Sequence, residues 1–234
     1  MLAGRGHAVA IHYHGSAAEA EALAGEIERA GSKAVPVRGD LADPAQIEAL
    51  LASAQAAVGP IRVLVNTAAI FEPDRAVDFP LDQWDRQLAI NLRAPVVLAR
   101  EFARLLPSDA GGLVVNLLDQ RIAAPTKSYF SYTMSKLALA AATELLATAL
   151  APRVRVNGIA PGLTLISGAQ TEADFERLID RTPLEKGSSL EAIAQALVYF
   201  LEADVVTGQI LFVDGGRRLT GRSGGHDAGR TPSA

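Results

Sequence analysis

Short apolar runs alternate with longer helical patterns along most of this chain. Six runs are predicted as strands, over residues 8–13, 33–38, 61–65, 113–118, 153–159 and 209–213. Helical spacing of apolar residues covers 17–30, 43–58, 81–106, 131–150, 171–179 and 190–201. Strands that alternate with helices of this length favour a parallel sheet with helices on both faces. The sequence therefore predicts a doubly wound, Rossmann-like α/β fold.

The length of 234 residues suits one large domain. We place this domain over residues 1–220. Residues 221–234 are rich in Gly, Ser and Pro, and we expect them to form a disordered tail.

Composition excludes several classes of function. The chain contains no cysteine, which rules out disulfides and thiolate metal sites. Its two neighbouring histidines, His12 and His14, are too isolated for a metal site, so we predict none. The net charge of −4, without a basic block, disfavours a nucleic-acid partner. With no apolar run of eighteen residues and no signal peptide, we expect a soluble cytoplasmic protein that does not bind membranes.

One stretch near the middle of the chain carries candidate chemistry. Tyr132 and Lys136 are four residues apart and would share one face of a helix. Asp119 ends the fourth predicted strand, thirteen residues before the tyrosine. A neighbouring ammonium lowers the pKa of a phenol, which makes it a usable proton donor. The alternative is that Tyr132 and Lys136 are an ordinary surface pair.

Ligands of doubly wound sheets bind beyond the carboxyl ends of the strands. The strand-end residues are therefore the candidates for binding: Tyr13 to Ser16, Asp40, Asn66, Asp119 and Pro161. Along the chain a set of motifs occurs in a fixed order: Asp40-Leu41, Asn66-Thr67-Ala68-Ala69, Asn91, Tyr132-x-x-x-Lys136, Pro161-Gly162 and Val213-Asp214-Gly215-Gly216. In this order and spacing, over about residues 7–216, the chain resembles the short-chain dehydrogenase/reductase superfamily.

Within that superfamily the chain looks most like the pteridine reductases, including dihydromonapterin reductases. Three features carry this resemblance. The stretch His12-Tyr13-His14-Gly15-Ser16 is similar to the one these enzymes use at the adenosine phosphate. Asp119 stands where most of the superfamily has serine, and Phe71 matches the aromatic residue on which their pterin stacks. The chain departs from the pattern at Gly15, where a basic residue is common, and at Thr67, where a second asparagine is usual.

A larger departure lies at the start of the chain. The superfamily opens with a strand and a Thr-Gly-x-x-x-Gly-x-Gly loop, and this chain has neither. That loop would cradle a pyrophosphate, and the strand is normally central in the sheet. We therefore expect the neighbouring strands to have unpaired edges. Either the true start lies upstream of Met1, which we favour, or the chain is truncated and poorly active.

The resemblance implies a catalytic set. Tyr132 would donate the proton. Lys136 would adjust the pKa of Tyr132 and hold the nicotinamide ribose, and Asn91 would hold a water that relays protons to Lys136. Asp119 would act with Tyr132 on a pterin nitrogen. Ordinary alternatives stay open for two of them, since Asn91 could be an exposed helical residue and Asp119 a strand-end cap. For Phe71 the alternative is loop packing.

The cofactor can be argued physically. An NAD site carries an acid near the end of the second strand, and here no carboxylate occurs between His12 and Ser16. Ser16, expected as an N-cap in a capping box with Glu19, could bind the 2′-phosphate of NADPH together with His14. By resemblance, Asp40 would accept from the adenine amino group, although it could be only a loop carboxylate. The other cofactor contacts implied are Leu41, Asn66, Ala68, Tyr132, Lys136, Pro161 and Gly162.

The sequence thus predicts an NADPH-dependent reductase of a pterin, with Phe71, Asp119 and Tyr132 contacting the substrate. Alternatives are a carbonyl reductase of the same superfamily, for example on 3-oxoacyl groups, and a catalytically silent protein. By resemblance, the long helices would pack a homotetramer, and residues 172–181 would form a lid rather than only a solvated helix.

Overall fold

The computed structural model of the chain describes residues 1–166 and 170–220, so the predicted tail lies outside the described residues. All six predicted strands are present within two residues of their expected bounds: β1 (Val9–Tyr13), β2 (Ala34–Arg38), β3 (Val63–Asn66), β4 (Gly112–Leu117), β5 (Val154–Pro161) and β6 (Ile210–Val213). Every strand pairing is parallel. The predicted doubly wound α/β fold is confirmed.

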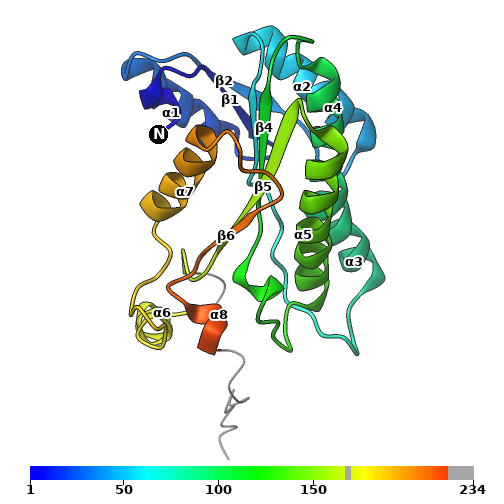
Figure 1. Cartoon of the computed structure of the whole chain (residues 1–234). Helices are drawn as coiled ribbons and strands as arrows, with labels where there is room; N and C mark the ends of the chain where they lie inside the picture. Colours follow the sequence, from blue (N-terminus) through cyan, green and yellow to red (C-terminus); the bar gives the residue numbers. More distant parts are fainter. Residues whose placement is uncertain (167–169, 221–234) are drawn as a thin grey trace, which may run out of the picture.

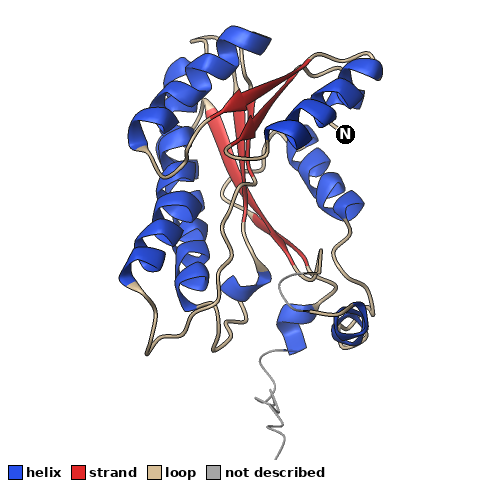
Figure 2. Ribbon diagram, turned by 180° about the vertical axis from the view of Figure 1, so that it is seen from behind, coloured by secondary structure: helices blue, strands red, loops and turns tan. Residues whose placement is uncertain are grey.

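Helices cover both faces of the strands (Figures 1 and 2). On one face lie α2 (Pro44–Val58), α4 (Ala94–Leu105) and α5 (Phe130–Leu150), and on the other lie α1 (Ala17–Arg29) and α7 (Leu190–Glu202). The largest buried cluster joins α2 and α4 to β4 and β5 through side chains such as Ile47, Phe102 and Val156. A second cluster packs Phe200 of α7 on the opposite face.

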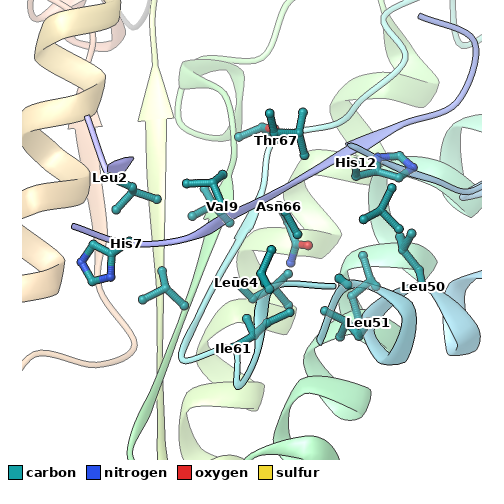
Figure 3. A pocket seen from close by; sticks show the side chains of 18 of the residues that line it. Leu2, His7, Val9, His12, Leu50, Leu51, Ile61, Leu64, Asn66 and Thr67 are labelled. Carbon is teal, nitrogen blue, oxygen red and sulfur yellow. The ribbon is translucent and has the colours of Figure 1, made fainter. Parts of the chain in front are cut away.

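The strands form two separate sheets. β2 pairs with β1, while β3, β4, β5 and β6 pair in that order, and β1 does not pair with β3. Between them lies a cavity of about 620 Å³ lined mainly by apolar side chains, including Val9 of β1, Leu64 of β3 and Leu51 of α2 (Figure 3). No described strand fills this slot, so the expected unpaired edges are confirmed.

The predicted helix over 81–106 is divided into three parts. A π-helical turn (Ala89–Arg93) separates α3 (Leu81–Leu88) from α4, and the amide of Ala94 donates to the carbonyl of Ala89, five residues back. Pro95 follows at once and has no N–H to continue the regular ladder. The helix is therefore interrupted by a widened turn, and π-helical turns of this kind are frequent at functional sites.

The first turns of α2 and α1 are capped differently. Asp43 accepts from the amide of Ala45 at 2.9 Å and caps α2, which begins at Pro44. Ser16 precedes α1, but its side chain makes no capping hydrogen bond, so the predicted capping box is wrong. Its backbone conformation, with φ −90° and ψ 60°, is not the extended one that orients a capping hydroxyl.

The remaining elements are short and lie at the start of the chain and around the strand ends: 3₁₀ turns at Ala3–Arg5 and Gln120–Ile122, α6 (Glu172–Ile179) and α8 (Arg217–Thr220). Among the described residues, no helix has the length and apolar character needed to cross a membrane.

Candidate active site

The central pair of the site is Tyr132 with Asp119. Asp119 follows β4, and Tyr132 lies in the first turn of α5. The tyrosine hydroxyl donates to Asp119 Oδ2 at 3.1 Å. The structure thus brings together the acid and the phenol that the sequence placed at one crevice.

Lys136 lies one turn further along α5, on the same side as Tyr132. Its ammonium is 5.7 Å from the centre of the tyrosine ring, and it donates to the carbonyl of Leu117 at 2.6 Å. The lysine is almost completely buried. The reading of Tyr132 and Lys136 as a surface pair is therefore wrong.

The expected direction of the Tyr132 pKa is also wrong in this structure. Burial raises the pKa of Tyr132 above its usual value, and the carboxylate of Asp119 raises it further. Lys136 is directed at the Leu117 carbonyl rather than at the phenol oxygen. Tyr132 therefore keeps its proton at neutral pH and presents it toward Asp119.

Burial lowers the pKa of Lys136 from 10.5 to about 8, against a smaller raising effect of Asp119. Between pH 8 and 10 the unfolded chain therefore binds a proton that the folded chain lacks. Because stability rises with pH wherever the unfolded state binds more protons, the free energy of unfolding should increase over this window by on the order of 2 kcal/mol. Above pH 10 the raised pKa of Tyr132 acts in the opposite direction.

Urea unfolding of the wild type and of Lys136→Met at several pH values tests this expectation. Methionine removes the titrating group but keeps an unbranched side chain, so the rise should be absent from the variant. Equal pH dependence of the two proteins would contradict it.

Arg121 and Tyr129, which the sequence did not predict, complete the site. Arg121 binds Asp119 with its backbone amide, at 2.8 Å, and with its guanidinium, at 3.3 Å. Phe71 stacks face to face on Tyr129, with ring centres 4.0 Å apart, and meets Tyr132 edge-on at 4.7 Å. The alternative of loop packing thus describes Phe71 in this structure, although its ring adjoins Tyr132.

The guanidinium of Arg121 lies beside this aromatic stack. Its central carbon is 5.2 Å from the ring centres of both Phe71 and Tyr129. The two rings are nearly parallel, and the guanidinium carbon is equally far from both ring centres. It therefore lies beside the stack and not over the outer face of either ring. This Phe71–Tyr129 stack in turn adjoins Tyr132. Its position two residues after Asp119 was the only sequence signal.

Asn91 is fully buried in the π-helical turn, so its reading as an exposed residue is wrong. Its side-chain oxygen Oδ1 accepts from the backbone N–H of Ile70, and its side-chain nitrogen Nδ2 donates to the carbonyl of the same residue, both at 2.9 Å. It also lies 3.2 Å from Ser135 Oγ on α5. Asn91 thus ties the segment before Phe71 to the helix that carries Tyr132.

Asn66 heads a buried polar chain across the sheet. Its amide donates to Asn116 Oδ1 at 2.8 Å, and Asn116 donates to Thr143 Oγ1 at 3.0 Å. Asn116 is a polar residue within the apolar run of β4, which was the signal for it. These hydrogen bonds fix the end of β3 against β4 and α5. Asn66 lines the slot between β1 and β3, as do Ala68 and Leu41.

His14, Ser16 and Asp40 gather at the carboxyl ends of β1 and β2. His14 Nε2 lies 3.9 Å from Asp40 Oδ2, and the imidazole is two-thirds exposed. Since Ser16 leaves the first turn of α1 without a side-chain cap, hydroxyl and amide donors are available there for an anion. His14 and Ser16 thus offer donors that suit a nucleotide phosphate, whereas the Asp40 carboxylate is an acceptor and would repel one. Asp40 also accepts from the Ala42 amide at 2.8 Å, so it orders its own loop.

Pro161 and Gly162 end β5 next to β6. The amide of Gly162 donates to Ser188 Oγ at 2.7 Å and to the Val213 carbonyl at 3.1 Å. A Cβ at residue 162 would come within 2.9 Å of the Asp214 backbone, so the close approach requires glycine. Ser188 was not predicted. Within the described ranges, no cluster of three or more His, Asp or Glu side chains could hold a metal ion.

Comparison with known proteins agrees with this arrangement. A family profile described as "Enoyl-(Acyl carrier protein) reductase" matches residues 1–218. A short-chain type dehydrogenase/reductase of Picea abies is 30% identical over 92% of this chain and 85% of its own length.

Two solved structures are similar throughout. FolM alternative dihydrofolate reductase 1 from Brucella canis, complexed with NADP, has a TM-score of 0.88 and 42% identity over 99% of this chain and 88% of its own. The Brucella suis enzyme of the same name, also with NADP, has a TM-score of 0.90 and 44% identity over 93% and 87%. With its strand-end motifs and the Tyr132–Lys136 pair in place, the chain belongs to the short-chain dehydrogenase/reductase superfamily.

Proposed function

We propose that this protein is an NADPH-dependent reductase of a pterin, such as a dihydropterin or dihydrofolate. The observation that carries the proposal is the hydrogen bond of the Tyr132 hydroxyl to Asp119, beside the ring of Phe71. A carboxylate can bind the ring N–H and amino groups of a pterin, and an aromatic ring can stack on its flat heterocycle. The likeness to two dihydrofolate reductases with bound NADP supports it.

In this proposal each residue of the site has one task. The cofactor supplies a hydride when it is bound, and Tyr132 gives its proton to a ring nitrogen of the substrate. Asp119, held by Arg121, accepts hydrogen bonds and orients both partners. Lys136 stabilises the phenolate left on Tyr132, because an ammonium favours a neighbouring anion. Asn91 would hold a water that returns protons toward Lys136.

A carbonyl reductase of the same superfamily, acting for example on 3-oxoacyl groups, is the second candidate. The oxyanion that forms from a carbonyl is stabilised by neutral or cationic donors. Asp119 beside Tyr132 would repel it, which is why we favour the pterin. With NADPH as reductant, kcat/KM should be higher for 7,8-dihydropterin than for a 3-oxoacyl thioester, and the reverse order would support the carbonyl reductase.

The cofactor proposal rests on His14, Ser16 and the free first turn of α1, with Asp40 at the adenine. Leu41, Asn66, Ala68, Pro161 and Gly162 would complete the contacts. A charge-assisted hydrogen bond to the 2′-phosphate is worth about 1.5–3 kcal/mol, so NADPH should bind roughly 10- to 100-fold more tightly than NADH.

Calorimetric titration of this chain with NADPH and NADH measures that preference. Ser16→Asp places a carboxylate at the phosphate position and should abolish the preference by weakening NADPH binding. Equal affinity of the wild type for both nucleotides would contradict the phosphate site. If the chain binds neither NADPH nor NADH, the hypothesis of a catalytically silent protein is favoured. The structural argument for that hypothesis is the slot between β1 and β3.

We also propose that the protein is cytoplasmic, in keeping with the absence of cysteine. In addition, we propose that it forms a homo-oligomer. Met134, Leu137 and Leu145 on α5 are exposed apolar side chains, and Leu145 is 71% accessible. A tetramer would bury them.

A further inference from the structure

The helix that carries Tyr132 has an unusual beginning. Tyr129 occupies the N-cap position of α5 with φ 61° and ψ 46°, in the left-handed region, and its side chain makes no capping hydrogen bond. This conformation costs a residue with a Cβ about 1–2 kcal/mol. The first amides of a helix have no partner within the helix. Something outside α5 must therefore hold this turn.

Asp74, from the connection between β3 and α3, supplies that hold. Both of its carboxylate oxygens accept from the amide of Ser131, at 3.1 and 3.2 Å. Its backbone carbonyl accepts from the amide of Tyr129 at 2.9 Å. Asp74 is only 8% exposed. A residue 57 positions away in sequence thus caps the helix immediately before Tyr132.

The same connection carries Phe71, three residues before Asp74. Asn91 fixes its start at Ile70, and Asp74 fixes its end at α5. Between these two points Phe71 stacks on Tyr129 and touches the edge of Tyr132. The cap and the aromatic contacts therefore join the loop and the helix at one place.

We propose that Asp74 is a positioning residue that caps α5 from the neighbouring loop and thereby sets Phe71 against Tyr132. This inference rests on the proposed function, since Phe71 and Tyr132 are the rings proposed to contact the flat heterocycle. Without the carboxylate, the Ser131 amide loses its acceptor, and the left-handed turn at Tyr129 keeps only the backbone hydrogen bond to Asp74. Phe71 and Tyr132 would then shift relative to each other.

Three variants test the role. Asp74→Ala removes the acceptor, Asp74→Asn keeps a side-chain oxygen for the Ser131 amide, and Asp43→Ala removes the cap of α2 as a matched control. Asp74→Ala should weaken binding of dihydropterin by about tenfold or more, from the loss of charge-assisted hydrogen bonds that order the site. Asp74→Asn should restore most of the affinity. Asp43→Ala should leave it unchanged, and NADPH affinity should change less than twofold in both Asp74 variants.

A second readout does not depend on the pterin. Trp84, the single tryptophan, packs against Phe130 in the first turn of α5, with ring centres 6.0 Å apart. Loosening of that turn in Asp74→Ala should increase quenching of Trp84 fluorescence by acrylamide, and Asp43→Ala should not. If the wild type binds no pterin, the proposed function fails, while the quenching still tests the cap.

The inference is overturned if Asp74→Ala has wild-type quenching, or if it and Asp43→Ala change pterin affinity equally. Should Asp74→Ala fail to fold, Asp74→Asn carries the test. Asparagine offers the Ser131 amide one weaker acceptor, so this variant should change dihydropterin affinity and Trp84 quenching in the same direction but by less. If both quantities are identical to those of the wild type, the proposal is overturned.

Discussion

Replacing Tyr132 with phenylalanine is expected to lower kcat for dihydropterin reduction by about 10²–10⁴-fold, the usual contribution of a positioned general acid. The structure gives two reasons. The hydroxyl is the group that donates to Asp119 at 3.1 Å, and it is protonated at neutral pH because burial and that carboxylate raise its pKa. NADPH affinity should change much less than kcat.

The matched control is Tyr129→Phe, which removes a hydroxyl from the ring that stacks on Phe71. Because the stack needs only the ring, this variant should keep most of the wild-type kcat. Steady-state kinetics of both variants separate a missing proton from a disturbed pocket. Comparable losses in the two variants, or an undiminished rate in Tyr132→Phe, would remove Tyr132 from the proposed role.

Replacing Asp119 with serine should produce the second largest effect. The change removes the acceptor of both Tyr132 and Arg121 and the carboxylate proposed to bind the pterin. Loss of hydrogen bonds to a charged group costs about 1.5–3 kcal/mol, so kcat/KM for dihydropterin should fall roughly 10- to 100-fold. Serine also removes the negative charge that opposes a carbonyl oxyanion, so any activity on a 3-oxoacyl thioester should rise.

Asp119→Asn serves as the control, because it keeps the shape and one acceptor oxygen while removing the charge. It should lie between the wild type and Asp119→Ser for the pterin. Unchanged dihydropterin turnover in Asp119→Ser would mean that Asp119 is only the cap of the short turn that follows β4, where it does bind the Arg121 amide.

Local patterns in the sequence predicted most of the fold. Each strand is a short, mainly apolar run, and the slot between β1 and β3 followed from the order of the motifs. Tyr132 and Asp119 could be joined in advance because one ends a strand and the other begins the next helix, and both must lie at the same edge of the sheet.

Contacts between distant segments could not be predicted. Asp74 binds the Ser131 amide in α5, 57 positions further along the sequence. Tyr129 adopts a left-handed conformation that its sequence neighbours do not predict. The Tyr132 pKa was given the wrong direction because burial, its largest cause, and the contact with Asp119 come from tertiary packing, whereas residue spacing fixes only the helix face that Lys136 occupies. Ser16 had the right residue type for a cap, yet its backbone is turned away from the capping geometry.

The most direct test of the central claim is NADPH oxidation by the purified 234-residue chain in the presence of 7,8-dihydropterin, with Tyr132→Phe measured alongside. The proposal predicts that the wild type consumes NADPH in equal amount to the tetrahydropterin formed, and that the variant is slower by at least two orders of magnitude. A wild-type chain that binds NADPH and dihydropterin but forms no tetrahydropterin would contradict it.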